Sequence, residues 1–171
     1  MKNIKVIKNT GNNEWNTPKK FTDSAKIVMG KITLDPASNK SAQCFVKAKK
    51  FYSKKNNALE KKWKGKIWMN PPYSNGTIGK FIDKFIQEYE NGNIKEAVVL
   101  VNNGTETRWF QKLIALVDNF VFVKGRISFF KPNGETGPPL QGQIIMYIGG
   151  KNKTKFKKEF SKYGIICDVK K

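Results

Sequence analysis

Histidine is absent from the 171 residues of this chain, and cysteine occurs only at Cys44 and Cys167. Without imidazole, neither a Ser-His-Asp nor a Cys-His catalytic arrangement is available. The two cysteines lie far apart outside a Cys-x-x-Cys pair, so they provide no zinc ligand set, and we expect two reduced thiols. The sequence therefore predicts that any enzymatic chemistry proceeds without imidazole and without a metal ion.

Long apolar runs are missing as well. No segment approaches the roughly 20 apolar residues that a membrane-spanning helix requires. The N-terminal segment, residues 1–16, is polar and lacks the apolar centre of a secretion signal. We therefore expect a soluble cytoplasmic protein without a membrane partner.

Acidic residues are scarce: 13 Asp and Glu face 33 Lys and Arg, which gives a net charge of +20 at pH 7. A field of this sign attracts polyanions and is typical of nucleic-acid binders. Because almost all of the excess is lysine, a simple compositional bias is the alternative explanation. An anionic membrane surface is less well supported, since no long basic amphipathic helix carries an aromatic face. Charge therefore favours nucleic acid as the partner.

The hydrophobic pattern predicts that helices and strands alternate along the chain. We expect Thr17 to cap a helix whose first residue is Pro18. The expected helices span residues 18–29, 38 or 39–49, 78–89 and 107–117, with a short helix after 151. The expected strands span residues 31–34, 66–69, 97–101, 120–123, 126–130, 143–148 and 165–169, with a Gly/Pro-rich loop at 131–142.

This alternation predicts an α/β fold with a mostly parallel sheet and helices on both faces. Residues 1–13 are expected to form a basic arm, 14–150 one domain, and 151–171 a basic tail packed as a last helix and strand. Ligands in such sheets bind beyond the carboxyl ends of the strands. Asp35 and Asn70 both follow predicted strands, so we expect them to lie in the same crevice.

The strongest chemical signal is the segment Asn70-Pro71-Pro72-Tyr73. This segment can activate an exocyclic amine such as N6 of adenine, which is a poor nucleophile because its lone pair is delocalised into the ring. The Asn70 side-chain carbonyl and the next main-chain carbonyl can accept its two hydrogens, and Pro71 fixes the direction of that carbonyl. Tyr73 offers a ring for base stacking. The alternative is a Pro-Pro turn with an Asn cap and a partly buried tyrosine.

These segments together resemble the small phage-encoded Dam-like DNA N6-adenine methyltransferases. The resemblance rests on an ordered set of segments: Glu14-Trp15-Asn16-Thr17-Pro18, Leu34-Asp35-Pro36-Ala37, Trp68-Met69-Asn70-Pro71-Pro72-Tyr73, Thr105-Glu106-Thr107-Arg108-Trp109-Phe110 and Gly125-Arg126-Ile127-Ser128-Phe129. It implies a minimal Rossmann-like class I methyltransferase fold without a separate target-recognition domain. It also implies a bacterial host cell, S-adenosylmethionine (AdoMet) as methyl donor and DNA as substrate. The sequence does not choose between a monomer and a weak dimer.

The resemblance further implies a donor pocket lined by Trp15, Thr17 and Pro18, with Asp35-Pro36 forming the donor-binding turn. The alternatives are a core-edge tryptophan, a helix cap and an ordinary turn. Two departures bear on this pocket. Ala37-Ser38-Asn39 replaces the glycine-rich loop common in methyltransferases. Asn57 replaces the family's usual acidic residue, and we expect it to bond to the adenine of AdoMet in its place.

Phosphate contacts are expected from basic residues on several loops: Lys54 and Lys55 in the basic run 47–66, Arg108, and Arg126. Solvated charge is the alternative. Sequence reading then falls to the loops 74–79 and 131–142, and the target base must flip out of the stack to reach Asn70. RNA adenine, protein glutamine, or a degenerate module that only binds DNA remain alternative functions.

Overall fold

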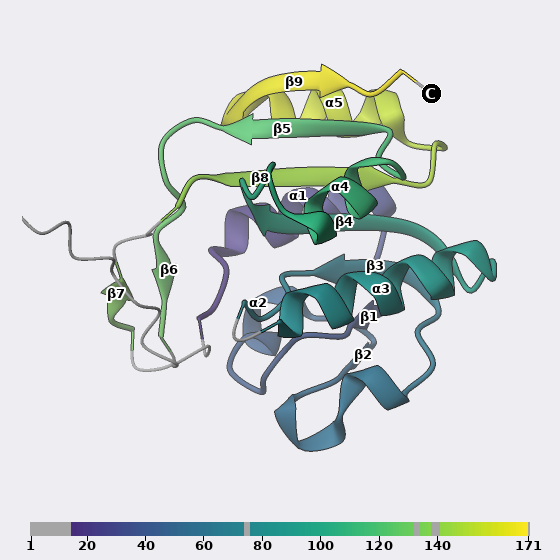
Figure 1. Cartoon of the computed structure of the whole chain (residues 1–171). Helices are drawn as coiled ribbons and strands as arrows, with labels where there is room; N and C mark the ends of the chain where they lie inside the picture. Colours follow the sequence, from purple (N-terminus) through teal and green to yellow (C-terminus); the bar gives the residue numbers. More distant parts are fainter. Residues whose placement is uncertain (1–14, 74–75, 132–133, 138–140, 171) are drawn as a thin grey trace, which may run out of the picture.

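The computed structural model describes residues 15–73, 76–131, 134–137 and 141–170, in which a central sheet carries helices on both faces (Figure 1). The described sheet has seven strands in the order β2-β1-β3-β4-β8-β5-β9. Their bounds are β1 Leu34–Asp35, β2 Lys50–Phe51, β3 Gly65–Met69, β4 Ile94–Asn102, β5 Asn119–Val123, β8 Gln143–Ile148 and β9 Gly164–Asp168.

The strand directions confirm an α/β fold with a mixed sheet. Strands β1 to β4 pair in parallel with one another. Strand β8 is antiparallel to both β4 and β5, so β5 runs in the direction of β4, and β9 runs against β5. Strands β1 to β5 therefore all have their carboxyl ends at the same edge of the sheet.

Helices cover both faces because the central strands are apolar on both sides. In β4, Ala97, Val99 and Val101 pack toward one core and Val98 and Leu100 toward the other. Helices α3 (Thr77–Glu90) and α4 (Arg108–Ile114) cover the first face, and α1 (Lys19–Met29) and α5 (Lys153–Phe160) cover the second, as Figure 1 shows. The expectation of helices on both faces is confirmed.

Residues after position 151 are integral to the second core. Phe156 and Phe160 of α5 have no exposed surface, and their rings stack on one another. The helix leads through the 3-10 turn η3 (Ser161–Tyr163) into β9, so the short helix and last strand expected from the sequence are both present.

Several expected elements differ from the structure. The helix expected at 38–49 is confined to α2 (Gln43–Val46), because turns occupy its start and Lys47 adopts a left-handed conformation with φ 51°. The helix expected at 107–117 ends at Ile114, with Thr107 as its cap. The strand expected at 31–34 begins only at Leu34 and includes Asp35, because Asp35 lies in register with Phe51 of β2.

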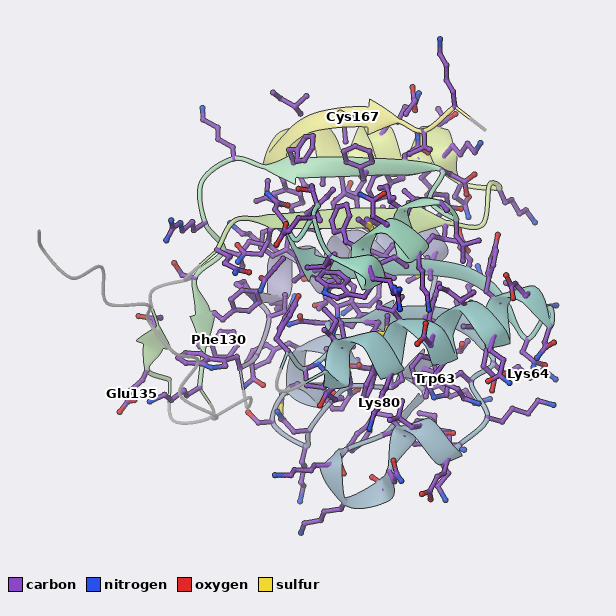
Figure 2. All side chains as sticks on the ribbon, in the orientation of Figure 1. Trp63, Lys64, Lys80, Phe130, Glu135 and Cys167 are labelled. Atoms are coloured by element: carbon purple, nitrogen blue, oxygen red, sulfur yellow. The ribbon has the colours of Figure 1, made fainter. Side chains whose placement is uncertain are left out.

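The region after β5 also differs from expectation. The strand expected at 126–130 consists of Phe129–Phe130 alone (β6), which pairs with Thr136–Gly137 (β7) inside the expected loop. This hairpin projects beside the main sheet, with Phe130 and Glu135 on it, as Figure 2 shows. The 3-10 turns η1 (Lys54–Asn56) and η2 (Ala58–Glu60) lie in the loop between β2 and β3.

No helix within the described ranges is both long and apolar enough to cross a membrane. The same residues hold no group of three or more His, Cys, Asp or Glu side chains suited to a metal ion. The basic arm expected at 1–13 lies outside the described residues.

Candidate active site

The carboxyl ends of β1 and β3 lie side by side at the topological switch point of the sheet. From β1, the next strand β2 is added on one side, whereas β3 is added on the other. In open α/β sheets, ligands bind beyond the carboxyl ends of the strands at such a switch point. Asp35 is the last residue of β1 and Asn70 directly follows β3, so the topology brings these two residues to neighbouring strand ends.

Asn70 is held in one orientation by a buried hydroxyl. Its side-chain Nδ2 donates a hydrogen bond of 3.2 Å to Oγ1 of Thr17, a residue that is 6% exposed. Within the described residues, Asn70 Oδ1 accepts no hydrogen bond from the protein. The half-buried Asn70 therefore keeps a carbonyl oxygen available for an external donor.

The expectation that Thr17 caps the first helix is wrong. The capping position belongs to Pro18, α1 begins at Lys19, and no side chain caps its first turn. Pro18 has a φ of −54° and a ψ of 134°, and this extended ψ keeps it outside the helix. The Thr17 hydroxyl is consequently free of a capping role and bonds to Asn70.

Tyr73 is fixed at the end of the neighbouring strand. Its hydroxyl accepts a hydrogen bond of 2.9 Å from the backbone N–H of Asn102, the last residue of β4. Burial raises the pKa of this hydroxyl above its usual value. Pro71 is buried, whereas Pro72 and Tyr73 are half-buried. The segment after β3 thus crosses to the end of β4 with one face of the aromatic side chain packed on the core.

Asp35 is 2% exposed, and its carboxylate is bound by its own turn and by the start of α2. Its Oδ1 accepts from the Ala37 backbone N–H at 3.2 Å, and its Oδ2 accepts from Gln43 Nε2 at 3.1 Å. Burial raises the pKa of Asp35 to about 7, because desolvation outweighs these hydrogen bonds. Asp35 therefore both shapes the turn with the buried Pro36 and titrates near neutrality.

The family described as DNA N-6-adenine-methyltransferase (Dam) matches residues 5–157 of this chain. The chain belongs to the Dam family. A DNA N-6-adenine-methyltransferase of Escherichia phage T1 is 29% identical over 146 residues, which cover 75% of this chain and 57% of the relative. A second one, from Haemophilus phage HP1 (strain HP1c1), is 36% identical over 93 residues, covering 53% of this chain and 51% of the relative. This Dam family chain thus spans little more than half the length of these relatives.

Asn16, a buried asparagine that was not among the site residues predicted from the sequence, extends the site of this Dam family member. Asn16 is 1% exposed, its Nδ2 donates to Ser41 Oγ at 3.0 Å, and its Oδ1 accepts from Asn39 Nδ2 at 3.4 Å. Its backbone pairs with Phe130 through hydrogen bonds of 2.7 and 3.2 Å. Its position between Trp15 and Pro18, within one of the segments that resemble the family, is the sequence feature that could have identified it as a site residue.

Trp15 joins the β6–β7 hairpin to the site. The Lys131 ammonium lies 5.7 Å from the centre of its ring. A Cβ atom at Gly137 would lie only 2.1 Å from Cη2 of the Trp15 ring, so the ring packs directly on the glycine backbone. Together with the Asn16–Phe130 pair, this contact fixes the base of the hairpin beside Thr17 and Pro18.

The other residues selected from the sequence lie farther out. Asn57 is exposed, has a φ of 43°, and donates a hydrogen bond from its side chain to Glu60. Lys54 and Lys55 are exposed on η1, and Arg108 is exposed at the first turn of α4. Arg126 is exposed in the segment between β5 and β6. Among the described residues, no hydrogen bond or ion pair links Lys54, Lys55 or Arg108 to Asn70.

The aromatic residues of the basic run 47–66 do not form a nucleic-acid surface. Trp63, labelled in Figure 2, has no exposed surface and donates from its indole nitrogen to the Ala58 carbonyl at 2.9 Å. Tyr52 is 5% exposed and donates to the Lys62 carbonyl at 3.0 Å. Only Phe51, at 36%, is exposed, so the aromatics of this run anchor the loop to the core.

Proposed function

We propose that this chain transfers a methyl group from AdoMet to the exocyclic N6 amine of adenine in DNA. The observation that carries the proposal is the Asn70 side chain in a member of the Dam family. Its amide is held by Thr17 at the carboxyl edge of the sheet, and Oδ1 accepts no hydrogen bond from the described residues. The finer fold assignment, a Rossmann-like class I methyltransferase without a separate recognition domain, is part of this proposal.

The chemistry rests on two acceptors aimed at one amine. Asn70 Oδ1 accepts one N6 hydrogen and the Pro71 carbonyl accepts the other, which localises the nitrogen lone pair for attack. Both acceptors belong to a segment fixed by Thr17 and by the Tyr73 hydroxyl, so little reorganisation accompanies the reaction. AdoMet supplies the electrophilic methyl group, and this step requires no imidazole.

The target adenine enters the site flipped out of its stack. Half-buried Tyr73 and Pro72 offer apolar surface next to the two acceptors, and the extruded base stacks on the Tyr73 ring. Because the Tyr73 hydroxyl is bonded to the Asn102 N–H, the ring keeps its position whether or not a base is present.

The residues present fit AdoMet at the carboxyl end of β1. Asp35 is the only carboxylate at the switch point among the described residues that is buried and titrates near pH 7, and such a group favours a cationic partner such as an ammonium. In this proposal Trp15, Thr17, Pro18 and Pro36 line the donor site, and Asn57, exposed in the loop after β2, bonds to the donor's adenine. Ala37-Ser38-Asn39, in place of glycines, makes this donor site minimal.

DNA contacts are assigned to the same edge of the molecule. Lys54, Lys55, Arg108 and Arg126 follow or precede strand ends on the carboxyl side and contact phosphates. The β6–β7 hairpin and the start of α3 contact the bases and recognise the DNA target sequence. Residues 14–150 form the catalytic domain, 1–13 an arm, and 151–171 the segment that closes its core.

A transfer assay with tritiated methyl-AdoMet tests the proposal. The protein is incubated with DNA, RNA or a glutamine-containing protein, and the methylated product is hydrolysed and identified by mass spectrometry. The expected product is N6-methyladenine from DNA alone. Label in RNA or protein would move the acceptor, and AdoMet-independent DNA binding without any transfer would favour the degenerate binding module, which the substituted glycine loop and Asn57 would then explain.

A further inference from the structure

A groove of about 340 Å³ lies at the carboxyl edge, on the β5 side of Asn70. Three segments form its walls: the first turn of α1, the segment that follows β5, and the 3-10 turn η3. Each segment contributes cations, namely Lys20, Lys124 with Arg126, and Lys162, and none of the residues lining this basic groove is acidic. It differs from the basic run 47–66, which lies on the β2 side of the sheet.

The basic groove is a built feature and more than a cluster of surface lysines. The Tyr163 hydroxyl lies 2.8 Å from Ser24 Oγ and donates to the Lys20 carbonyl at 3.0 Å, while its own carbonyl accepts from the Lys124 N–H at 2.8 Å. The Tyr163 ring packs 4.7 Å from Phe21. One tyrosine thus joins all three walls and fixes the spacing of their cations.

The charge of the basic groove is only partly neutralised by the protein. Lys162 pairs with Glu159, which raises the pKa of the lysine. Lys20 and Lys124 form no ion pair with any carboxylate in the described part of the chain, although the Lys20 ammonium lies 5.1 Å from the Phe21 ring centre. Many other lysines do pair, as Lys19 and Lys26 do with Asp23. Lys20 and Lys124 therefore remain available to an external anion.

The position of the basic groove relates it to the site. Pro18 lines the groove, and its neighbour Thr17 bonds to Asn70. A base flipped toward Asn70 remains attached to a backbone whose phosphates continue on either side of it. A groove with cations on three walls fits several successive phosphates better than one small anion.

We propose that this basic groove binds the phosphate backbone of duplex DNA beside the flipped adenine, with Lys20, Lys124 and Arg126 as the contacting cations and Lys162 assisting. The inference rests on the proposed function. It adds a direction for the DNA: the duplex leaves the Asn70 site across Pro18 toward the carboxyl end of β5.

The test compares two variants that lose the same three charges. The groove variant carries Lys20→Gln, Lys124→Gln and Arg126→Gln. The control carries Lys31→Gln, Lys64→Gln and Lys95→Gln, all exposed at the amino ends of β1, β3 and β4, on the opposite edge. The measurements are Kd for a labelled DNA duplex and for an RNA duplex of the same length, each against salt, with AdoMet affinity as the check on the donor site.

We expect the groove variant to weaken DNA binding about tenfold more than the control and to reduce the log–log salt slope by about 2 to 3 units, since each phosphate contact contributes about 0.9. AdoMet affinity stays unchanged in both. Equal losses in the two variants, or groove-dependent binding of RNA but not DNA, would overturn the proposal. If the triple variant folds poorly, Lys124→Gln against Lys95→Gln carries the same comparison. Failure of the proposed function appears separately, as no methyl transfer by the wild-type protein.

Discussion

At the scale of single residues, the two polar side-chain atoms of Asn70 have different roles. Nδ2 is bound to Thr17, and Oδ1 is left for the substrate amine. We predict that Asn70→Ala lowers kcat about 100-fold or more while AdoMet binds normally, because the lost acceptor acts chiefly in the transition state. Steady-state kinetics and calorimetry measure both effects. Asn70→Asp, which keeps an acceptor oxygen, retains more activity, and near-normal kcat in Asn70→Ala would remove Asn70 from the catalytic centre.

Thr17 acts on the reaction through the orientation of Asn70. We predict that Thr17→Val, which keeps the shape but removes the hydroxyl, lowers kcat about fivefold, since one neutral hydrogen bond contributes about 1 kcal/mol. Thr17→Ser is the matched control and stays close to wild type. A fall in Thr17→Ser with normal activity in Thr17→Val would indicate that the methyl group of Thr17 matters, and that its hydrogen bond does not.

Asp35 makes stability depend on pH in the direction opposite to most carboxylates. Its pKa is about 7 in the folded protein, against an ordinary value of 3.8. Between these values the folded state holds a proton that the unfolded state releases, so stability is greatest below the ordinary pKa and is lost as pH rises toward and through 7.

We predict that the free energy of unfolding falls by roughly 3 kcal/mol between pH 5 and pH 8, at about 1.4 kcal/mol per pH unit up to the folded pKa. Urea titrations at several pH values measure it, and Asp35→Asn removes the dependence. The chain has no histidine to titrate in this window, and Glu88, Asp23 and Glu159 all have lowered pKa values that place them below it. A flat profile in the wild type would show that Asp35 is charged at both pH values.

At the scale of elements, β9 depends on a glycine where two backbones approach closely. A Cβ atom at Gly164 would lie 1.9 Å from the Phe122 carbonyl oxygen of β5, and backbone cannot move aside as a flexible side chain can. We predict that Gly164→Ala lowers the free energy of unfolding by about 2 kcal/mol. Because Gly164 follows Tyr163, this variant also weakens DNA binding through the basic groove.

Gly79→Ala is the matched control for that measurement. Gly79 lies in α3 with nothing within 4 Å of an added Cβ atom, so alanine stabilises the protein by roughly 0.5–1 kcal/mol. Urea midpoints that moved in the same direction for both glycines would contradict the close approach of β5 and β9.

At the scale of the whole molecule, the charge of +20 acts at long range in addition to any local contact. We predict that the association constant for duplex DNA falls with salt with a log–log slope steeper than about −3, as expected for four or more phosphate contacts. Fluorescence anisotropy at salt concentrations from about 50 to about 200 mM measures this slope. Lys54→Gln with Lys55→Gln tests how much of the slope comes from the β2 side of the sheet. A flat wild-type dependence would argue against nucleic acid and favour a protein substrate.

Local sequence patterns determined most of the elements. The unbroken apolar run Ala97–Val101 required a strand covered on both faces, and the spacing of Ile78, Phe81, Ile82 and Phe85 required α3. The prolines after Asn70 ended β3 where the sequence indicated. These features were predictable because period and proline geometry act within a few residues.

Only the tertiary structure decided which distant residues meet. Thr17 looked like a helix cap, yet its hydroxyl is used 53 positions later by Asn70. Trp63 and Tyr52 lie in a lysine-rich run of the sequence, yet both are buried because the loop folds back onto α3. The basic groove joins Lys20, Lys124 and Lys162, which no local pattern relates. Sequence fixes what each segment prefers, whereas long-range packing decides which polar atoms are left unpaired and which cations share one surface.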